Sequence, residues 1–505
     1  MERLFGLETE YGIQVDGADD MDVVVESMEL IRCYLHENFI ARWDYGRENP
    51  RLDMRGFEVG ELRNDKDETL HLQQDRQRKI PLRELKSDLL ISNGARLYND
   101  HTHPEYSTPE CYSLFDLLEQ DRAGERILYN CAQRRTATRG KGVVRLYKNN
   151  TDFEGHSYGC HENYLISRQM PFQQVINGLL PFLVTRQIFA GAGKVGVEQE
   201  RKVRPGIYQL SQRADFFETI ASVDTMHRRP LVNTRDEPHA EADKYRRLHL
   251  IIGDANMSEF ITALKVGTTL IFLDLLEAEL LPSLSLADPI AALKQISRDP
   301  AHVWAVALQD GSHLTALEIQ QLYLEKATSF AAGRDRETDW VLAAWGAVLE
   351  KLGRDPNELI GQCDWVTKKW LLDAFADDEG LDWEKPDDRA WLQSQDLEYH
   401  NIDPGEGLYL LLEGQEQVER LVDEGGIRRA LVQPPAGTRA YFRGRFLERF
   451  GASVRALNWD SIEIALNDRV ETINLKACVD AAVINYYNQI LDEAESIEDL
   501  IGKLP

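Results

Sequence analysis

Apolar and polar positions alternate or recur with a helical period along most of the chain, and this pattern predicts its elements. Strands are expected where short apolar or alternating runs occur, at residues 3–15, 94–99, 143–148, 163–167 and 247–253. Helices are expected where apolar residues recur every three to four positions, at residues 21–39, 172–190, 258–281 and through most of 314–375. This order predicts an α+β fold, with a strand-rich N-terminal half followed by a helical layer.

A polar stretch interrupts the pattern between residues 43 and 93. Its centre, residues 63–79, holds nine charged side chains and few large apolar ones. Long segments of this composition are typically surface loops that cover or bind ligands. We therefore expect a mobile loop at about residues 62–82.

A second change of composition occurs near Gly425–Gly426. The shorter segment beyond it shows strand patterns at 440–443 and 461–466. A chain of 505 residues is also too long for one hydrophobic core, which stops growing at about 250–300 residues. We expect a catalytic domain at 1–425 and a small C-terminal domain at 426–505.

The net charge of the chain limits the classes of molecule that it is expected to bind. Lysine and arginine number 58 against 85 aspartate and glutamate residues, which gives a formal net charge of −27. Proteins that bind nucleic acids or anionic membranes need a surplus of basic residues, so both classes are excluded. Hydrophobic residues make up 43% and charged residues 28% of the chain, which is typical of a folded globular protein.

Nothing in the sequence predicts export or membrane insertion. The N-terminus lacks a basic segment followed by an apolar one. The most apolar stretch, residues 264–281, carries four charges, too many for a spanning helix. The six cysteines are scattered without a CxxC pair, which favours reduced thiols. We expect a soluble, cytoplasmic protein.

Glu8 and Glu10 are the first candidates for chemistry. They lie two positions apart in a predicted strand, so both side chains point to one face. Two buried acids on that face would need a cation, because an unpaired buried charge is costly. The alternative places the same face in solvent, and the spacing alone leaves both open.

Polar side chains are densest in residues 93–110. They comprise three residues on one face of a predicted strand and four that follow it: Arg96, Tyr98, Asp100, His101, His103, Glu105 and Glu110. Oxygen ligands with a few imidazoles suit Mg²⁺ or Mn²⁺ rather than structural zinc. Arginines among carboxylates suggest a phosphate beside the metal ions. A surface network of ion pairs is the alternative.

Two common nucleotide-binding motifs are excluded. Residues 191–196 match GxGxxG but follow a predicted helix, whereas a dinucleotide site needs a strand before the glycines. We expect a helix end and a turn there. The chain contains no GxxxxGK[ST] sequence, and therefore no P-loop.

Nine sequence strings, in order along nearly the whole chain, resemble one family. They are GLETEYG, NGARLYNDHTHPEYSTPE, YKNNTD, SYGCHENYL, PFLVTRQIFAGAGKVG, LSQRADFFE, NTRDEPHAEADKYRRLHLIIGDANMSE, QPPAGTRAYFRG and NWDS. The family contains the deamidase/depupylase Dop and the ligase that act on the prokaryotic ubiquitin-like protein Pup. The string DHTHPEYSTPE, in which His101 follows Asp100, and the polar insert before it resemble the Dop branch.

The resemblance implies a glutamine-synthetase-like (carboxylate–amine ligase) fold of the α+β class. In that fold an antiparallel sheet forms a cradle for ATP and Mg²⁺, and a small C-terminal domain is attached. The implied catalytic carboxylate is Asp100. The implied metal ligands are Glu8, Tyr98, Glu105, His161 and His249. The implied nucleotide-binding residues are Gly6, Glu10, Arg96, Ser107, Thr108, Asn163, Arg235 and Trp459.

The resemblance also implies the activity. It is an ATP- and Mg²⁺-dependent hydrolase that deamidates the C-terminal Gln of Pup to Glu and cleaves the isopeptide bond between Pup and a lysine. Asp100 can act as a general base toward water or attack the carbonyl itself, and the sequence leaves both open. The alternatives are a ligase of the same fold, which joins Pup to lysines with ATP, and a non-catalytic module that binds Pup or a nucleotide.

Pup and pupylated proteins are the partners that the resemblance implies, and Pup is acidic. Residues 428–455 hold seven arginines against one acid, a local net charge of +6. A local positive potential can attract an acidic partner despite the overall sign. Arg439, Arg443 and Arg445 are therefore candidates for Pup binding. The alternative is that these arginines pair with nearby acidic helices.

Overall fold

The computed structural model describes residues 3–17, 21–35, 42–63, 73–198, 208–225, 227–466 and 469–505. The expected loop at 62–82 lies partly outside this description, which omits residues 64–72. In its described part, residues 73–78 are helical and α3 (Leu82–Lys86) follows. The C-terminal part of the expected loop is therefore largely helical.

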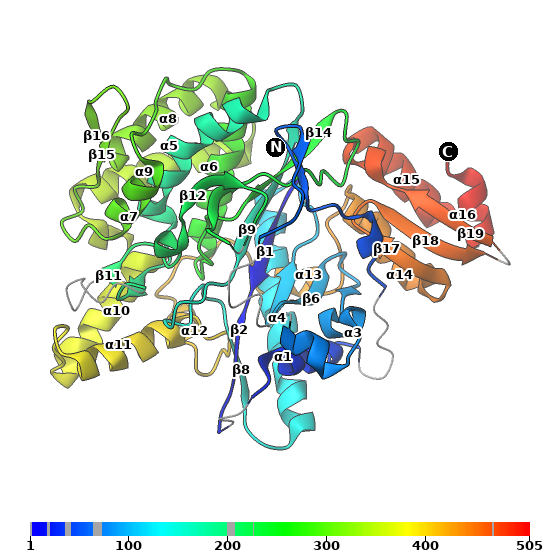
Figure 1. The fold of residues 1–505 in the computed structure, drawn as a ribbon, viewed down its shortest axis with the longest axis horizontal. Helices are drawn as coiled ribbons and strands as arrows, with labels where there is room; N and C mark the ends of the chain where they lie inside the picture. The colour runs from blue at the N-terminus through cyan, green and yellow to red at the C-terminus, as the bar shows by residue number, and fades with distance from the viewer. Residues whose placement is uncertain are drawn as a thin grey trace.

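A six-stranded sheet runs through the middle of the molecule (Figure 1). Its strand order is β14-β9-β1-β7-β6-β5, and every neighbouring pair is antiparallel. The strands are β1 (Phe5–Glu10), β5 (Leu89–Leu90), β6 (Arg96–Asp100), β7 (His103–Ser107), β9 (Cys160–Ser167) and β14 (Tyr245–Leu250). The predicted α+β class with an antiparallel sheet is confirmed.

The central strand β1 shows why the two faces of the sheet differ. Phe5 and Leu7 are buried and belong to the main hydrophobic cluster. Gly6, Glu8 and Glu10 alternate with them and point to the opposite face, because successive side chains of a strand alternate. The prediction that the two glutamates share a face is confirmed.

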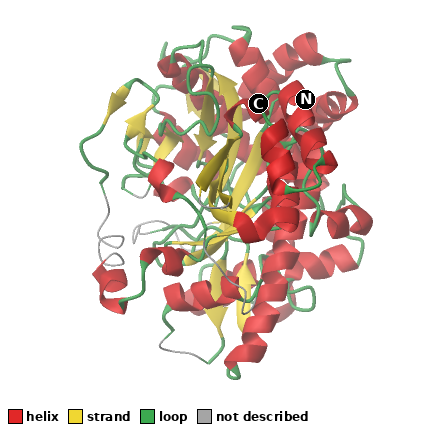
Figure 2. Ribbon diagram, turned by 90° about the vertical axis from the view of Figure 1, so that its right-hand side faces the viewer, coloured by secondary structure: helices red, strands yellow, loops and turns green. Residues whose placement is uncertain are grey.

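Helices pack against the sheet and on one another, and in Figure 2 most helices lie along one side of the strands. They are α1 (Val23–Arg32), α4 (Leu114–Arg139), α5 (Phe172–Ala190), α6 (Glu259–Glu277), α7 (Pro289–Ser297), α8 (Ala316–Ala331) and α9 (Arg336–Arg354). The helices predicted at 172–190 and 258–281 are confirmed as α5 and α6. Gly191 ends α5, as expected of the glycine-rich stretch.

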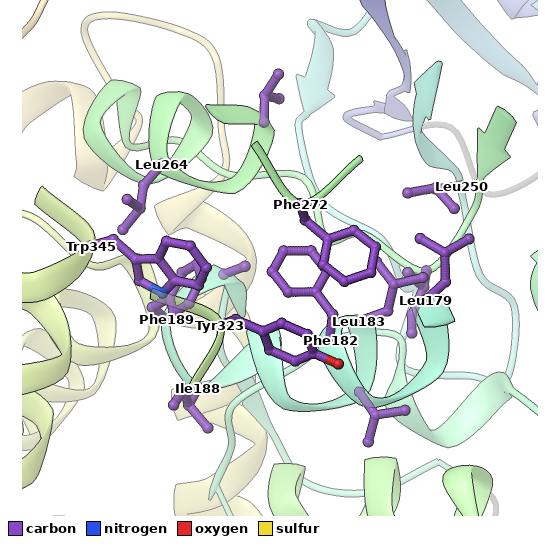
Figure 3. Packing of buried hydrophobic residues seen from close by; sticks show 14 of the residues in the cluster. Leu179, Phe182, Leu183, Ile188, Phe189, Leu250, Leu264, Phe272, Tyr323 and Trp345 are labelled. Atoms are coloured by element: carbon purple, nitrogen blue, oxygen red, sulfur yellow. The ribbon is translucent and has the colours of Figure 1, made fainter. Parts of the chain in front are cut away.

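Aromatic side chains fill the centre of this helical layer (Figure 3). Phe182 of α5 stacks on Phe272 of α6 with 4.4 Å between the ring centres. Tyr323 and Trp345 meet the Phe182 ring edge-on from α8 and α9. Burial of one such side chain contributes about 1.5–3 kcal/mol, so the layer is a stable base for the sheet.

Helix α4 packs behind the sheet although it carries many charges. Asp121 and Glu125 are buried and both accept hydrogen bonds from Lys148 Nζ, at 2.7 and 2.8 Å. Arg122 donates to Glu125 at 2.6 Å. Because each buried charge in this group has an opposite partner, the helix can lie in the interior.

A second body of structure lies to the right of the sheet in Figure 1 and has a hydrophobic cluster of its own. Its elements are α14 (Arg439–Phe450), β17 (Val454–Asn458), β18 (Ser461–Leu466), β19 (Arg469–Asn474), α15 (Ala481–Glu493) and α16 (Ile497–Lys503). Trp43, from far earlier in the chain, joins this cluster.

Two expectations for this region need correction. Residues 440–443 are helical, not a strand, because Phe442, Phe446 and Phe450 recur every four positions and Thr438 caps the helix. The boundary expected at 425 falls inside α13 (Glu424–Ala430), which packs on α4. The separate cluster begins later, at Phe442.

The remaining described elements are short strand pairs and peripheral helices. They are β2 (Gly12–Val15), β8 (Val144–Tyr147), β3 (Leu52–Asp53), β4 (Phe57–Glu58), β10 (Lys194–Val195), β11 (Tyr208–Gln209), β12 (Thr219–Ser222), β13 (Pro230–Asn233), β15 (Ala305–Ala307), β16 (His313–Thr315), α10 (Asp364–Glu379), α11 (Pro386–Tyr399) and α12 (Leu408–Gly414). No helix in the described part of the chain combines the length and apolar character that a membrane crossing needs.

Candidate active site

The register of the sheet gathers distant residues on its polar face. Glu8 of β1 pairs with His161 of β9 on one side and with Ser107 of β7 on the other. Glu10 pairs with Glu105. Side chains directly opposite each other in an antiparallel pair are close neighbours. Antiparallel pairing of β1 with β7 and β9 therefore builds the site.

Glu8, His161 and His249 form the first cluster of possible metal ligands. One ligand atom from each lies within 4.8 Å of the others. His161 Nδ1 lies 3.3 Å from Glu8 Oε2, and Asn163 Nδ2 donates to Glu8 Oε1 at 3.0 Å. Burial and the neighbouring Arg247 lower the pKa of His249 well below its usual value, although the charge of Glu8 opposes this shift.

Glu10, Asp100 and Glu105 form the second cluster, again with ligand atoms within 4.8 Å of one another. Tyr98 OH donates a hydrogen bond to Glu105 at 2.7 Å. His103 lies 3.3 Å from Glu10. The two clusters share β1, which supplies Glu8 to one and Glu10 to the other.

The acids of the site differ in their pKa. Burial opposes ionisation of Glu8, but the two histidines and Arg247 outweigh it and hold its pKa below the usual value. Burial raises the pKa of Glu105 well above its usual value, and the charges of Asp100, Glu8 and Glu10 raise it further. A group of carboxylates that disfavours its own ionisation is suited to a cation, which would remove the repulsion.

The donors of both clusters fit a hard divalent cation, since they are carboxylate oxygens with two imidazoles. Of the expected metal ligands, the structure brings Glu8, His161 and His249 together in one cluster and places Glu105 in the other. Tyr98 touches the second cluster through its hydrogen bond to Glu105. Burial, together with the charge of Glu105, raises the pKa of Tyr98 well above the usual value and keeps its hydroxyl protonated.

A cavity opens to solvent next to the first cluster, with about 570 Å³ of empty space that includes the open side. Five expected nucleotide-binding residues line it: Gly6, Ser107, Thr108, Asn163 and Trp459. Apolar side chains of Leu4, Pro238 and Val479 and the basic group of Arg247 complete the part of the lining that suits a base and phosphates.

The other expected nucleotide residues lie outside that lining. Glu10 belongs to the second cluster. Arg96 stands between the rings of Trp43 and Tyr98, 3.8 Å from each centre, and pairs with Asp88 at 2.6 Å.

Arg235 is turned toward another segment. Its Nε donates to Val223 O at 2.8 Å, and it is not among the described residues that line the cavity.

Sequence reasoning missed two charged residues of the site. Arg247 Nη1 donates to Asn163 Oδ1 at 2.7 Å and lies 3.5 Å from Glu8 Oε1. Its spacing of two from His249 in a strand was a usable signal, because both then share a face. Lys86 Nζ lies 3.4 Å from Asp100 Oδ1. No sequence signal pointed to it, because the contact depends on how α3 packs against β6.

The expected Pup-binding arginines have different surroundings. Arg439 Nε and Arg443 Nη1 donate to Glu110 Oε1 at 2.6 and 2.9 Å, and both arginines are buried. These two arginines attach α14 to the loop after β7 and form no exposed basic patch, and their role in Pup binding stays a prediction. Arg445 is partly exposed and pairs with Glu448, and its role in Pup binding stays a prediction.

Comparison with known proteins identifies the family. The family described as Pup-ligase protein matches residues 3–463. The chain belongs to the Pup-ligase family. The depupylase of Acidothermus cellulolyticus is 41% identical over 100% of this chain and 99% of its own length. The Pup deamidase/depupylase of Mycolicibacterium smegmatis is 40% identical over 100% of both chains.

A ligase of the same family and two solved structures are also similar to this chain. The Pup–protein ligase of Nakamurella multipartita is 43% identical over 77% of this chain and 87% of its own. A crystal structure of the complex between Pup and its ligase PafA has a TM-score of 0.79 at 32% identity, covering 100% of this chain and 95% of that one. A structure of PafA with ADP has a TM-score of 0.73 at 34% identity, covering 90% and 99%. The fold is therefore that of the Pup ligase.

Proposed function

We propose that this protein is an ATP- and Mg²⁺-dependent amidohydrolase that acts on Pup. It deamidates the C-terminal Gln of Pup to Glu and cleaves the isopeptide bond between Pup and lysine side chains. The observation that carries the proposal is the similarity to depupylases over 100% of this chain, together with a site that contains two clusters of carboxylates and histidines. Its partners are Pup and pupylated proteins.

Asp100 is the proposed catalytic residue. Burial opposes its charge, but His101, Lys86 and Arg96 outweigh burial and hold its pKa below the usual value. An ionised carboxylate at the end of β6 is able to take a proton from water or to attack the amide carbon directly. In the second route an acyl anhydride forms as the amine leaves, and water then hydrolyses it to regenerate Asp100.

The proposed cofactors occupy the cavity and the two clusters. ATP would lie in the cavity that Gly6, Thr108 and Trp459 line, and the structure of PafA with ADP supports a nucleotide in this fold. Glu8, His161 and His249 would hold one Mg²⁺, and Glu105 with Glu10 would hold another. Bound Mg²⁺ supplies positive charge that offsets negative charge on phosphates and on the reacting carbonyl oxygen.

The free cysteines of the protein suggest a cellular compartment. All six cysteines are free thiols in the structure, and five of them are buried. Free thiols persist in a reducing environment. We propose the cytoplasm as the location of the protein.

One assay separates the proposed activity from ligation, which the 43% identity to a Pup–protein ligase keeps as the second candidate. The purified protein is incubated with Pup ending in Gln, ATP, Mg²⁺ and a lysine-containing protein. We expect release of ammonia and conversion of Gln to Glu by mass spectrometry, both dependent on nucleotide. A second incubation uses Pup ending in Glu. Covalent Pup–protein conjugates in that incubation, without deamidation in the first, would identify a ligase and contradict the proposal.

A further inference from the structure

Lys86 brings a positive charge to the proposed catalytic carboxylate. Its Nζ atom lies 3.4 Å from Asp100 Oδ1. The same ammonium group stands over the rings of Tyr45 and Tyr98, 5.3 and 5.9 Å from their centres. Aromatic faces attract cations, so the two rings help to fix the ammonium group beside Asp100.

The fold tethers α3, which carries Lys86, to the strand that carries Asp100. Asn99 Nδ2 donates to Leu85 O at 3.1 Å. Leu85 is buried, and Arg32 of α1 donates to the main-chain oxygen of Glu84 at 3.3 Å. Lys86 thus directly follows two residues, Glu84 and Leu85, whose main chain is anchored to α1 and β6.

Two further carboxylates lie beside Asp100, so its orientation depends on the charges around it. Oxygen atoms of Glu10, Asp100 and Glu105 lie within 4.8 Å of one another, and like charges at this distance repel. The other two acids have partners of their own, His103 for Glu10 and Tyr98 for Glu105.

We propose that Lys86 is a positioning residue for Asp100. The ion pair with the ammonium group fixes the orientation of the Asp100 carboxylate, so that it faces the reacting carbonyl or the attacking water. This inference rests on the proposed function, because it concerns the carboxylate that acts on the amide. It assigns Lys86 to the chemical step and not to binding of ATP or Pup.

Substitutions at position 86 test the inference in the deamidation assay. Lys86→Met and Lys86→Gln remove the charge, and we expect kcat to fall about tenfold or more in both. The KM for Pup and the Kd for ATP should stay within about twofold, because only the chemical step is affected. Lys86→Arg keeps the charge and should recover most of the lost kcat.

Arg83→Met is the matched control. Arg83 lies on the same helix and is exposed, and its replacement by methionine also removes one positive charge. The kcat of this variant should stay within about twofold of wild type. Thermal unfolding of each variant shows that it is folded.

Several outcomes would overturn the inference. They are wild-type kcat in both neutral variants, an arginine variant as slow as the methionine variant, and an effect confined to KM. A faster methionine variant would mean that Lys86 occupies the place of the substrate amine, which also contradicts a positioning role. If the wild-type protein releases neither ammonia nor Pup, the proposed function has failed, a result that is separate from any effect of Lys86 substitutions.

Discussion

Gly159 lies beside both ligand clusters, next to Glu10 of one and His161 of the other. A Cβ atom at this position would stand 2.5 Å from Glu10 Oε1 and 2.5 Å from His161 Nε2. Both side chains would have to move, since such distances are far below van der Waals contact. The positions of Glu10 and His161, one from each cluster, therefore depend on the absence of a side chain at Gly159.

Gly159→Ala is expected to lower depupylase activity by about tenfold or more, because small displacements of catalytic groups are costly. The thermal unfolding midpoint should change little by comparison. Gly414→Ala is the control, because nothing lies within 4 Å of the added carbon there. Wild-type activity of the Gly159 variant, measured over a range of Mg²⁺ concentrations, would contradict the proposed ligand clusters.

The residues of the site differ in how far sequence alone predicts them. Alternation in β1 is a local property, so it revealed that Glu8 and Glu10 share a face. The sequence gives no local sign that His161 stands beside Glu8, because that depends on which strands pair. The family resemblance supplied that residue. Lys86 was found by neither route, since it enters the site from a helix.

At the scale of elements, the accuracy of prediction depends on which side chains an element buries. Helix α5 is apolar enough that its bounds agree with prediction, Phe172–Ala190. Helix α4 was not predicted, because its buried face contains paired charges that disguise the apolar period. The pattern at residues 440–443 predicts a strand, because a four-residue window does not show the helical spacing of the phenylalanines beyond it.

The Glu110 carboxylate joins two elements, and its negative charge contributes to the stability of the folded state. Burial opposes its charge, yet Arg443 and Arg439 outweigh burial and lower its pKa to about 2. A carboxyl whose pKa is lower in the folded than in the unfolded state stabilises the fold above the unfolded pKa. That stability is lost as the pH falls from about 5 toward 2.

Glu110→Gln should therefore lower the free energy of unfolding at pH 7 by about 3 kcal/mol, because it leaves two buried guanidinium groups without their partner. The wild type should lose this difference as the pH falls below about 4, measured by urea unfolding. Glu448→Gln is the control on α14, since Glu448 is 62% exposed and its pair with Arg445 contributes little. Equal stability of the Glu110 variant and the wild type at pH 7 would contradict this account.

At the scale of the whole molecule, the net charge of −27 conceals several roles. Acids on β1 and β7 face one another in the site. Part of the basic segment 428–455 is used inside the protein, where Arg439 and Arg443 bind Glu110. A sequence count cannot separate these roles, because pairing between distant segments decides which charges remain on the surface.

The C-terminal body contributes to the site as well as to the architecture. Trp459 lines the same cavity as Gly6, although the two residues lie at opposite ends of the chain. Its ring meets Trp43 edge-on at 5.3 Å between centres. We propose that the small C-terminal unit begins after α13, where its separate hydrophobic cluster starts.

The most direct test of the account is cleavage of Pup linked to a fluorescent lysine amine, compared between the wild type and Asp100→Asn. With ATP and Mg²⁺, we expect the wild type to release the amine and the variant to release none above background. ATP binding, followed by tryptophan fluorescence because Trp459 lines the cavity, should be the same in both. Cleavage by the Asp100 variant at the wild-type rate would contradict the assignment of the catalytic carboxylate.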